Sequence, residues 1–135
     1  MNSTPYALII CGDAFAYIER ERPQFILTDC PHSLLAQVSK LVERHRLAWV
    51  NASSPRWLVG SDTGEKIVLP YQYLLANIPE LEVCDPFMGW GAIGVATLGS
   101  GKRFVGIDNV RDRCQHSYDR LCAAFPEARI KREGF

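Results

Sequence analysis

One stretch, residues 81–94, constrains this chain more than any other, because a buried-strand pattern runs there directly into a glycine-rich turn. Leu-Glu-Val-Cys-Asp at 81–85 predicts the strand, and three glycines spaced Gly-x-Gly-x-x-Gly predict the turn and the start of a helix. Residues 103–108 predict a second strand, which ends in Asp108. Strand, glycine turn, helix and strand-end acid outline a nucleotide-type cofactor site, because glycines admit the ligand and the acid can accept ribose hydroxyls. Nicotinamide, flavin and other nucleotide-type cofactors all fit this outline.

Strand and helix patterns alternate along the rest of the chain. Apolar residues form continuous runs, without the alternation typical of half-exposed strands, and these runs predict strands at residues 6–11, 24–28, 81–85 and 103–108. Apolar residues at helical spacing, with proline and glycine as stops, predict helices at residues 14–22, 34–44, 70–78, 92–98 and in a last segment up to 125. We therefore predict an α/β fold, with a mostly parallel sheet covered by helices on both faces.

Several shorter segments lead to local predictions. Residues 47–50 and 56–59 predict the two strands of a hairpin with a loose turn. Ser33 is predicted to cap the N-terminus of the helix that follows it. The polar residues 61–66 predict a loop, and the basic tail at 129–132 is expected to be solvated or frayed.

Length and composition indicate a single globular domain over residues 1–135. The formal net charge is zero, from 15 basic and 15 acidic residues, which argues against tight independent DNA binding. Any contact with nucleic acid would then depend on a local patch or on a partner. The N-terminus has no signal-peptide pattern and no apolar segment approaches a membrane span, so we expect a cytoplasmic protein without a membrane partner.

The cysteines are five in number, scattered, and never in a Cys-x-x-Cys pair. An odd, scattered set predicts buried free thiols in a reducing compartment rather than disulfides. The three histidines do not stand at metal-ligand spacings from these cysteines, so we expect no bound metal.

Acids follow four of the predicted strands, at Asp13, Asp29, Asp85 and Asp108. The carboxyl ends of parallel strands meet at one edge of the sheet, where open α/β sheets bind their ligands. We therefore expect these four side chains to lie along one edge. Each acid alone could instead cap the helix that follows it. All four together with the glycine turn favour a ligand site.

Residues 85–91, Asp-Pro-Phe-Met-Gly-Trp-Gly, resemble the cofactor motif of the amino DNA methyltransferases, which modify adenine N6 or cytosine N4. That family typically reads Asp-Pro-Phe-x-Gly-x-Gly at its S-adenosylmethionine site. Residues 104–108 resemble the next, ribose-binding strand, and Gly-Asp-Ala at 12–14 resembles a motif near the cofactor adenine. Residues 25–32 resemble the strand and catalytic loop usually written Asp-Pro-Pro-Tyr. The catalytic motif precedes the cofactor motif, as in the circularly permuted β-group, and the resemblance covers about residues 6–125.

The resemblance implies a Rossmann-like methyltransferase fold with S-adenosylmethionine as the cofactor. It implies that Asp29 and Pro31 position the target amine, and that His32 stacks on a base flipped out of the duplex. Because an exocyclic amine is a poor nucleophile, hydrogen bonds from its N–H groups to the Asp29 carboxylate and an adjoining carbonyl would favour a more reactive nitrogen. Asp108 would bind the ribose and Asp13 the adenine. The implied cofactor-binding residues of the glycine loop are Asp85, Pro86, Phe87, Gly89 and Gly91.

The chain departs from the family pattern at three positions and in its length. Cys30 replaces the first proline of the catalytic loop, His32 replaces its aromatic residue, and Leu69 stands where the family has a lysine. The segment between the catalytic loop and residue 61 is too short to hold a separate target-recognition domain.

Two functions follow from these observations. The first is a minimal S-adenosylmethionine-dependent methyltransferase that acts on the exocyclic amine of adenine or cytosine in DNA, as in restriction-modification. The alternative is a catalytically impaired methyltransferase-like protein that binds the cofactor or a partner protein and acts as a regulatory or binding module. DNA contact is expected to be weak or partner-assisted, the partner being a second copy of the chain or a larger methyltransferase.

Overall fold

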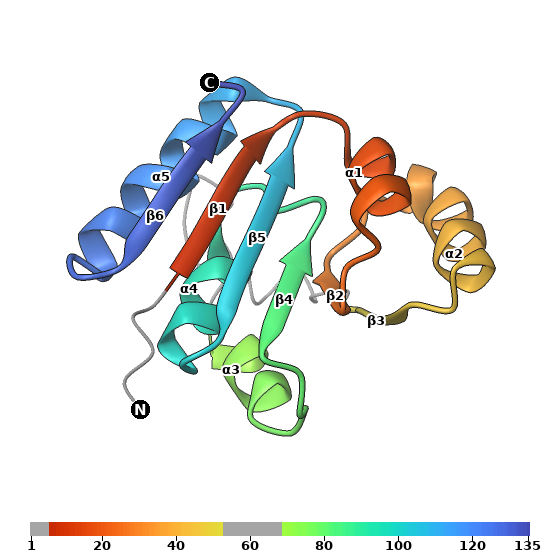
Figure 1. The fold of residues 1–135 in the computed structure, drawn as a ribbon, viewed down its shortest axis with the longest axis horizontal. Coiled ribbons are helices and arrows are strands. Elements are labelled where there is room, and N and C mark those ends of the chain that lie inside the picture. Colours follow the sequence, from red (N-terminus) through yellow and green to blue (C-terminus); the bar gives the residue numbers. More distant parts are fainter. Residues whose placement is uncertain (1–5, 53–68) are drawn as a thin grey trace.

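The structure is a computed structural model that describes residues 6–52 and 69–135. Within them, one six-stranded sheet has the order β3-β2-β4-β5-β1-β6, and every neighbouring pair runs parallel (Figure 1). The strands are β1 (Tyr6–Cys11), β2 (Phe25–Thr28), β3 (Ala48–Asn51), β4 (Glu82–Asp85), β5 (Arg103–Asp108) and β6 (Arg129–Glu133). The helices are α1 (Ala14–Glu21), the 3-10 helix η1 (His32–Leu34), α2 (Leu35–Arg44), α3 (Leu69–Leu75), α4 (Ala92–Gly99) and α5 (Arg111–Ala124). The predicted α/β fold with a mostly parallel sheet is confirmed.

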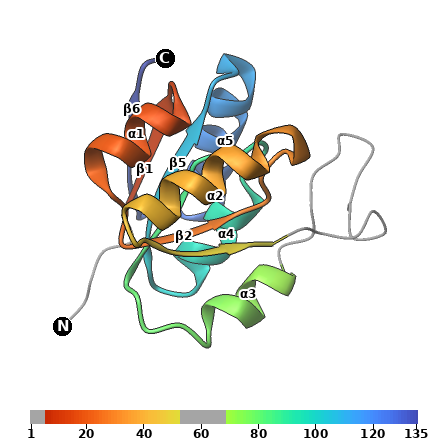
Figure 2. The same cartoon turned by 90° about the vertical axis from the view of Figure 1, so that its right-hand side faces the viewer.

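Each face of the sheet is covered by its own helices (Figures 1 and 2). β2 illustrates the division, because Phe25 and Leu27 pack into an apolar cluster with α3, α4 and α5, whereas Ile26 packs into a second cluster with α1 and α2. All three side chains are buried. A strand buried on both faces needs apolar residues at every position, which explains the continuous runs in the sequence.

The chain leaves β2 and β4 toward opposite faces of the sheet. β2 leads through η1 into α2 on one face, and β4 leads into α4 on the other. The two strands are neighbours, with Ile26 opposite Cys84. Open α/β sheets bind ligands at the carboxyl ends of the strands where the connections diverge in this way. The loops after Thr28 and Asp85 therefore lie on either side of a topological switch point.

The basic tail forms a strand. Most of its side chains are solvated, as predicted for residues 129–132, but the backbone is paired and not frayed. β6 pairs in parallel with β1, from Arg129 opposite Tyr6 to Glu133 opposite Ile10. An edge strand needs a partner on one side only and leaves most of its side chains in water, so its sequence lacks the apolar run of a central strand. Charged side chains along such an edge also hinder pairing with another chain.

The start of α2 also differs from the prediction. Ser33 lies inside η1, and Leu34 precedes α2 without a capping side chain. The Leu34 N–H donates to the Pro31 carbonyl at 2.9 Å, so the chain enters the helix through a tight turn that begins at Pro31. Backbone bonds in this turn replace the predicted serine cap.

The strand predicted at 47–50 is present as β3, and it pairs in parallel with β2. Its predicted hairpin partner at 56–59 and the predicted loop at 61–66 lie outside the described residues. The chain is described again from Leu69, where α3 begins.

Candidate functional site

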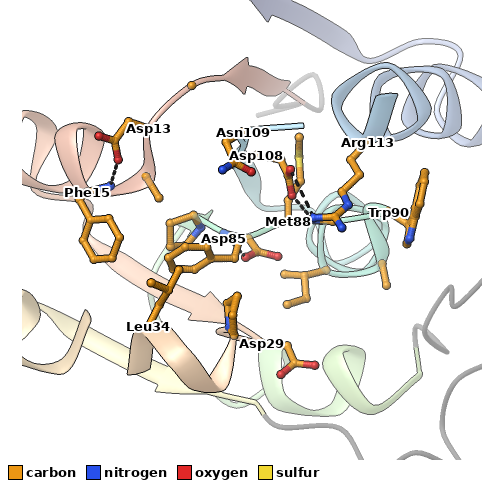
Figure 3. A pocket seen from close by; sticks show the side chains of 18 of the residues that line it. Asp13, Phe15, Asp29, Leu34, Asp85, Met88, Trp90, Asp108, Asn109 and Arg113 are labelled. Atoms are coloured by element: carbon orange, nitrogen blue, oxygen red, sulfur yellow. Dashed lines mark hydrogen bonds and ion pairs between the residues drawn. The ribbon is translucent and has the colours of Figure 1, made fainter. Parts of the chain in front are cut away.

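A cavity of about 550 Å³ opens at the carboxyl ends of β1, β2, β4 and β5 (Figure 3). Its volume lies in the range of small-molecule and cofactor sites. The predicted site residues that line it are Asp13, Asp29, Pro31, Asp85, Pro86, Phe87, Gly89 and Asp108. Gly91 and His32 are not among the lining residues.

All four strand-end acids line this one cavity, which confirms the prediction that they lie along one edge. Figure 3 shows Asp13, Asp29, Asp85 and Asp108 around it. The capping alternative also holds for one of them, because Asp13 is the N-cap of α1 and accepts the Phe15 N–H at 2.9 Å. A helix cap and a place in the cavity wall are compatible at that position.

Asp108 ties the end of β5 to the glycine turn. Its carboxylate accepts the Gly89 N–H at 3.0 Å through Oδ2 and the Val110 N–H at 2.9 Å through Oδ1. The Arg113 guanidinium lies 3.8 Å from Oδ1, and the Asp108 side chain is only 5% exposed. A carboxylate offers about four acceptor positions, so these contacts leave capacity for a hydroxyl group on the cavity side.

The glycine turn is bonded from two sides. The Met88 N–H donates to the Ile107 carbonyl of β5 at 3.0 Å. From α5, the Ser117 hydroxyl donates to the Gly89 carbonyl at 2.9 Å, and Arg120 donates to the Trp90 carbonyl at 3.0 Å. These bonds fix the backbone that borders the cavity.

Gly89 and Gly91 both have left-handed backbones, with φ of 54° and 93°, which glycine adopts without strain. A Cβ on Gly91 would come within 3.0 Å of the Ser117 hydroxyl, so this glycine allows α5 to approach the turn. A Cβ on Gly89 would meet no atom within 4 Å. Of the two, Gly89 is the one that borders the cavity, and its wall there is bare backbone.

Asp85 links the end of β2 to the turn that follows β4. It is 1% exposed, and its Oδ1 accepts the Thr28 hydroxyl at 2.6 Å and the Phe87 N–H at 3.1 Å. Thr28 is the last residue of β2, directly before Asp29, so this bond links the predicted catalytic loop to the cofactor motif. Phe87 in turn packs edge-on against Phe15 with ring centroids 6.0 Å apart, and both rings line the cavity.

The loop from Asp29 to His32 has a buried and an exposed part. Cys30 is buried, and burial together with the negative charge of Asp85 raises the pKa of its thiol. The thiol is therefore protonated at neutral pH and donates to the Pro31 carbonyl at 3.4 Å. His32 is exposed at the start of η1 and lies outside the cavity wall.

The sequence patterns did not single out several residues that line the cavity. Asn109 and Arg113 follow Asp108 closely in the chain, so proximity to the strand-end acid was an available signal. Tyr71 comes from α3 and is buried, and no local pattern connects it with the loops it meets. Phe15 and Leu34 add apolar surface from α1 and η1.

Three further features concern metal binding, membrane spans and the cysteines. Within residues 6–52 and 69–135, no group of three or more histidine, cysteine or acidic side chains could hold a metal ion. Among the same residues, no helix has the length and apolar character needed to cross a bilayer. All five cysteines are free thiols.

Comparisons with known proteins find a likeness in structure only. No protein-family model matches the chain, and no curated protein matches its sequence. The solved structure of M1.HpyAVI is 18% identical with a TM-score of 0.54, and the match covers 84% of this chain and 98% of that one. The structure of the M1.HpyAVI–SAM complex is 15% identical with a TM-score of 0.56, over the same shares of the two chains.

The third neighbour is TTHA0409 from Thermus thermophilus, provisionally assigned as a DNA modification methylase. It is 10% identical with a TM-score of 0.63, and the match covers 98% of this chain and all of the other. The chain therefore has the fold of these solved structures. This confirms the fold class that the sequence resemblance implied.

Proposed function

We propose that this chain binds S-adenosylmethionine in the cavity and transfers its methyl group to the exocyclic amine of adenine or cytosine in DNA. The observation that carries the proposal is the shared cavity of the four strand-end acids, with the Asp29 loop beside the glycine turn. The fold likeness to M1.HpyAVI, which has been solved as a complex with SAM, supports the choice of cofactor.

The residues of the cavity fit the chemistry of this cofactor. Asp108 keeps acceptor capacity for ribose hydroxyls, and the bare backbone at Gly89 leaves room for a ligand to approach closely. Phe15 and Phe87 offer apolar ring surface to a flat base. The four carboxylates also favour a ligand with positive charge, such as a sulfonium and an α-ammonium group.

In the proposed reaction the chain orients the amine rather than supplying a covalent intermediate. When bound, S-adenosylmethionine supplies a methyl group on a positively charged sulfur. Asp29 would accept a hydrogen bond from the amine and orient its nitrogen, because alignment of reacting atoms accounts for much of the rate in such transfers. The new nitrogen–carbon bond would replace the carbon–sulfur bond of the cofactor, and the amine would lose one proton. Pro31 shapes the loop beside a flipped base.

The position of His32 favours a second candidate function, a cofactor-binding protein with little or no transferase activity. His32 is exposed and lies outside the cavity wall, so no aromatic residue of this loop lines the cavity. Such a protein would act as a regulatory or binding module, alone or with a larger methyltransferase.

Calorimetry with S-adenosylmethionine, followed by a methyl-transfer assay on unmodified DNA, separates the two candidates. The enzyme proposal expects binding and transfer, with transfer to an adenine or a cytosine amine identified by nucleoside analysis. Binding without transfer would support the module, and the lack of binding would contradict the site assignment in both.

We further propose that the chain acts as a single domain and contacts DNA weakly or with the help of a second subunit. The formal net charge of zero supports this, because contacts of basic side chains with phosphates supply much of the affinity for DNA and the chain has no overall excess of basic residues. The five free thiols support a reducing cytoplasmic setting. The salt dependence of DNA binding tests whether the chain contacts DNA weakly, and the sedimentation behaviour of the chain tests whether a second subunit is present.

A further inference from the structure

Asn51 is the last residue of β3 and bonds to the loop that contains Asp29. Its Oδ1 accepts the Cys30 N–H at 3.0 Å. The strands are in register here, since Asn51 lies opposite Thr28, and the next residue, Ala52, donates to the Thr28 carbonyl at 2.7 Å. β3 thus continues to hold the chain beyond the end of β2, at the point where that chain enters the cavity wall.

The bond gives the backbone N–H of Cys30 a hydrogen-bond acceptor. Cys30 stands where the resembled motif has a proline, and a cysteine has a backbone N–H that a proline lacks. Cys30 is buried, and a buried N–H without an acceptor is strongly unfavourable. Asn51 supplies that acceptor from the neighbouring strand.

The same bond restricts Asp29. The Cys30 N–H and the Asp29 carbonyl belong to one planar peptide unit, and the described residues contain no cis peptide bond. Holding the N–H against Asn51 therefore fixes the plane of that unit and turns the Asp29 carbonyl away from Asn51. The side chain of Asp29 starts from the Cα at the edge of the same plane, so its direction into the cavity is restricted as well.

We infer that Asn51 is a positioning residue for Asp29. Its hydrogen bond from β3 restrains the loop where a proline would otherwise stiffen it. The inference rests on the proposed function in that Asp29 holds the target amine. Asn51 does not line the cavity, so it acts through the loop and has no direct contact with a bound cofactor.

The test is a set of double-variant comparisons. Asn51→Ala is made in the wild-type chain, in Cys30→Ala, which keeps the backbone N–H, and in Cys30→Pro, which removes it. For each protein, kcat and KM for methyl transfer to DNA and Kd for S-adenosylmethionine are measured. Asn77→Ala serves as the matched control, because Asn77 is exposed just after α3, lies outside the cavity wall, and donates to the Tyr73 carbonyl at 2.8 Å.

In the wild-type and Cys30→Ala backgrounds, Asn51→Ala is expected to lower kcat about tenfold or more, because a small misplacement of a positioning group is costly. Kd for S-adenosylmethionine should change less than about twofold, since the cofactor loop is bonded elsewhere. In the Cys30→Pro background the effect of Asn51→Ala should fall below about twofold, because no N–H remains to be held. An equal loss of kcat in all three backgrounds, or an equal loss of cofactor affinity, would overturn the inference.

Amide hydrogen exchange keeps the inference testable without activity or a folded proline variant. Asn51→Ala should increase exchange of the Cys30 amide about tenfold or more, while amides in β5 stay protected. Unchanged protection at Cys30 would overturn the inference even if transfer were normal. If the wild-type chain binds the cofactor but transfers no methyl group, the proposed function fails, and the exchange result then still decides whether Asn51 holds the loop that contains Asp29.

Discussion

On one side of the cavity, the turn from Met88 to Gly91 is bonded to both β5 and α5, through Ile107, Asp108, Ser117 and Arg120. On the other side, the loop from Asp29 to His32 is bonded to Asn51 of β3 and continues into exposed residues. We call these the cofactor side and the amine side. The difference suits the proposed roles, because a cofactor pocket benefits from a preformed wall, whereas a target base must enter and leave.

The two sides meet at a buried bond between Thr28 and Asp85, 2.6 Å long. Through this bond the rigid cofactor side supports the strand that presents Asp29. Substitutions on the cofactor side are therefore expected to affect stability and cofactor affinity together, and substitutions on the amine side to affect transfer alone.

The largest effect is expected from Asp29→Ala, which removes the group proposed to hold the amine. Methyl transfer should fall by about a hundred- to ten-thousandfold, the range typical of groups that act directly on a reacting atom. Kd for S-adenosylmethionine should stay within about twofold, because the glycine turn is held by β5 and α5. Transfer assays and calorimetry on the same preparation measure both quantities. An equal loss of both would show that the two sides are not separable.

Asp108→Ala is the corresponding change on the cofactor side. It leaves the Gly89 and Val110 N–H groups without their acceptor, so the free energy of unfolding should fall by about 2–4 kcal/mol. Kd for S-adenosylmethionine should rise at least about tenfold, because both the turn and the proposed ribose contact are lost. Urea denaturation and calorimetry check the two values.

Asp112→Ala is the matched control for Asp108→Ala. Asp112 is an exposed acid in the first turn of α5, so its loss should cost about 0.5 kcal/mol through the helix dipole and leave cofactor affinity unchanged. If Asp108→Ala and Asp112→Ala lost the same stability and the same cofactor affinity, the bonds of Asp108 to the glycine turn would not explain the losses.

The cofactor side was also the part that the sequence predicted best, for a physical reason. Its strand, its glycines and Asp85 are consecutive residues, so one local pattern contains most of the geometry. The carboxyl ends of parallel strands must share an edge, which brought in Asp13, Asp29 and Asp108 from distant segments. Neither argument needs knowledge of individual side-chain contacts.

The features of the site that the sequence did not predict depend on contacts between segments far apart in the chain. Asn51 bonds to Cys30 across neighbouring strands, whereas the sequence pattern places it at the start of a hairpin turn. Tyr71 reaches the cavity from α3, whose placement follows from packing in the core. Spacing alone also cannot separate Gly91, which admits Ser117, from Gly89, which borders the cavity.

Gly94→Ala tests whether the wall behind the cofactor side is closely packed. A Cβ at this position would lie 2.8 Å from the Phe104 ring, and both residues are buried. Overpacking should cost about 1–3 kcal/mol, partly offset by the helix preference of alanine. Gly99→Ala is the control, because its Cβ would have Phe125 at an ordinary 3.9 Å and should leave stability within about 1 kcal/mol. Thermal unfolding of the pair would contradict the prediction if Gly94→Ala were as stable as the wild type.

The smallest effect is expected from Arg113→Gln, which removes the guanidinium beside Asp108 and keeps a polar, uncharged side chain. The Arg113 side chain is 45% exposed and its nitrogen lies 3.8 Å from the carboxylate, whereas the backbone donors lie at 2.9 and 3.0 Å. An exposed ion pair contributes less than about 1 kcal/mol, so unfolding should change by less than that amount. Kd for S-adenosylmethionine should shift less than about threefold, and the shift should shrink as salt screens the remaining charges.

Comparison of Arg113→Gln with Asp108→Ala then decides what holds the glycine turn. If the backbone bonds dominate, only the aspartate variant weakens cofactor binding strongly, because Gly89 and Val110 keep their acceptor when Arg113 is replaced. If the two variants lose affinity equally, the guanidinium organises Asp108 or contacts the ligand itself, since it also lines the cavity. The cofactor side would then depend on an exposed side chain, and the contrast with the amine side would be smaller than the backbone bonds indicate.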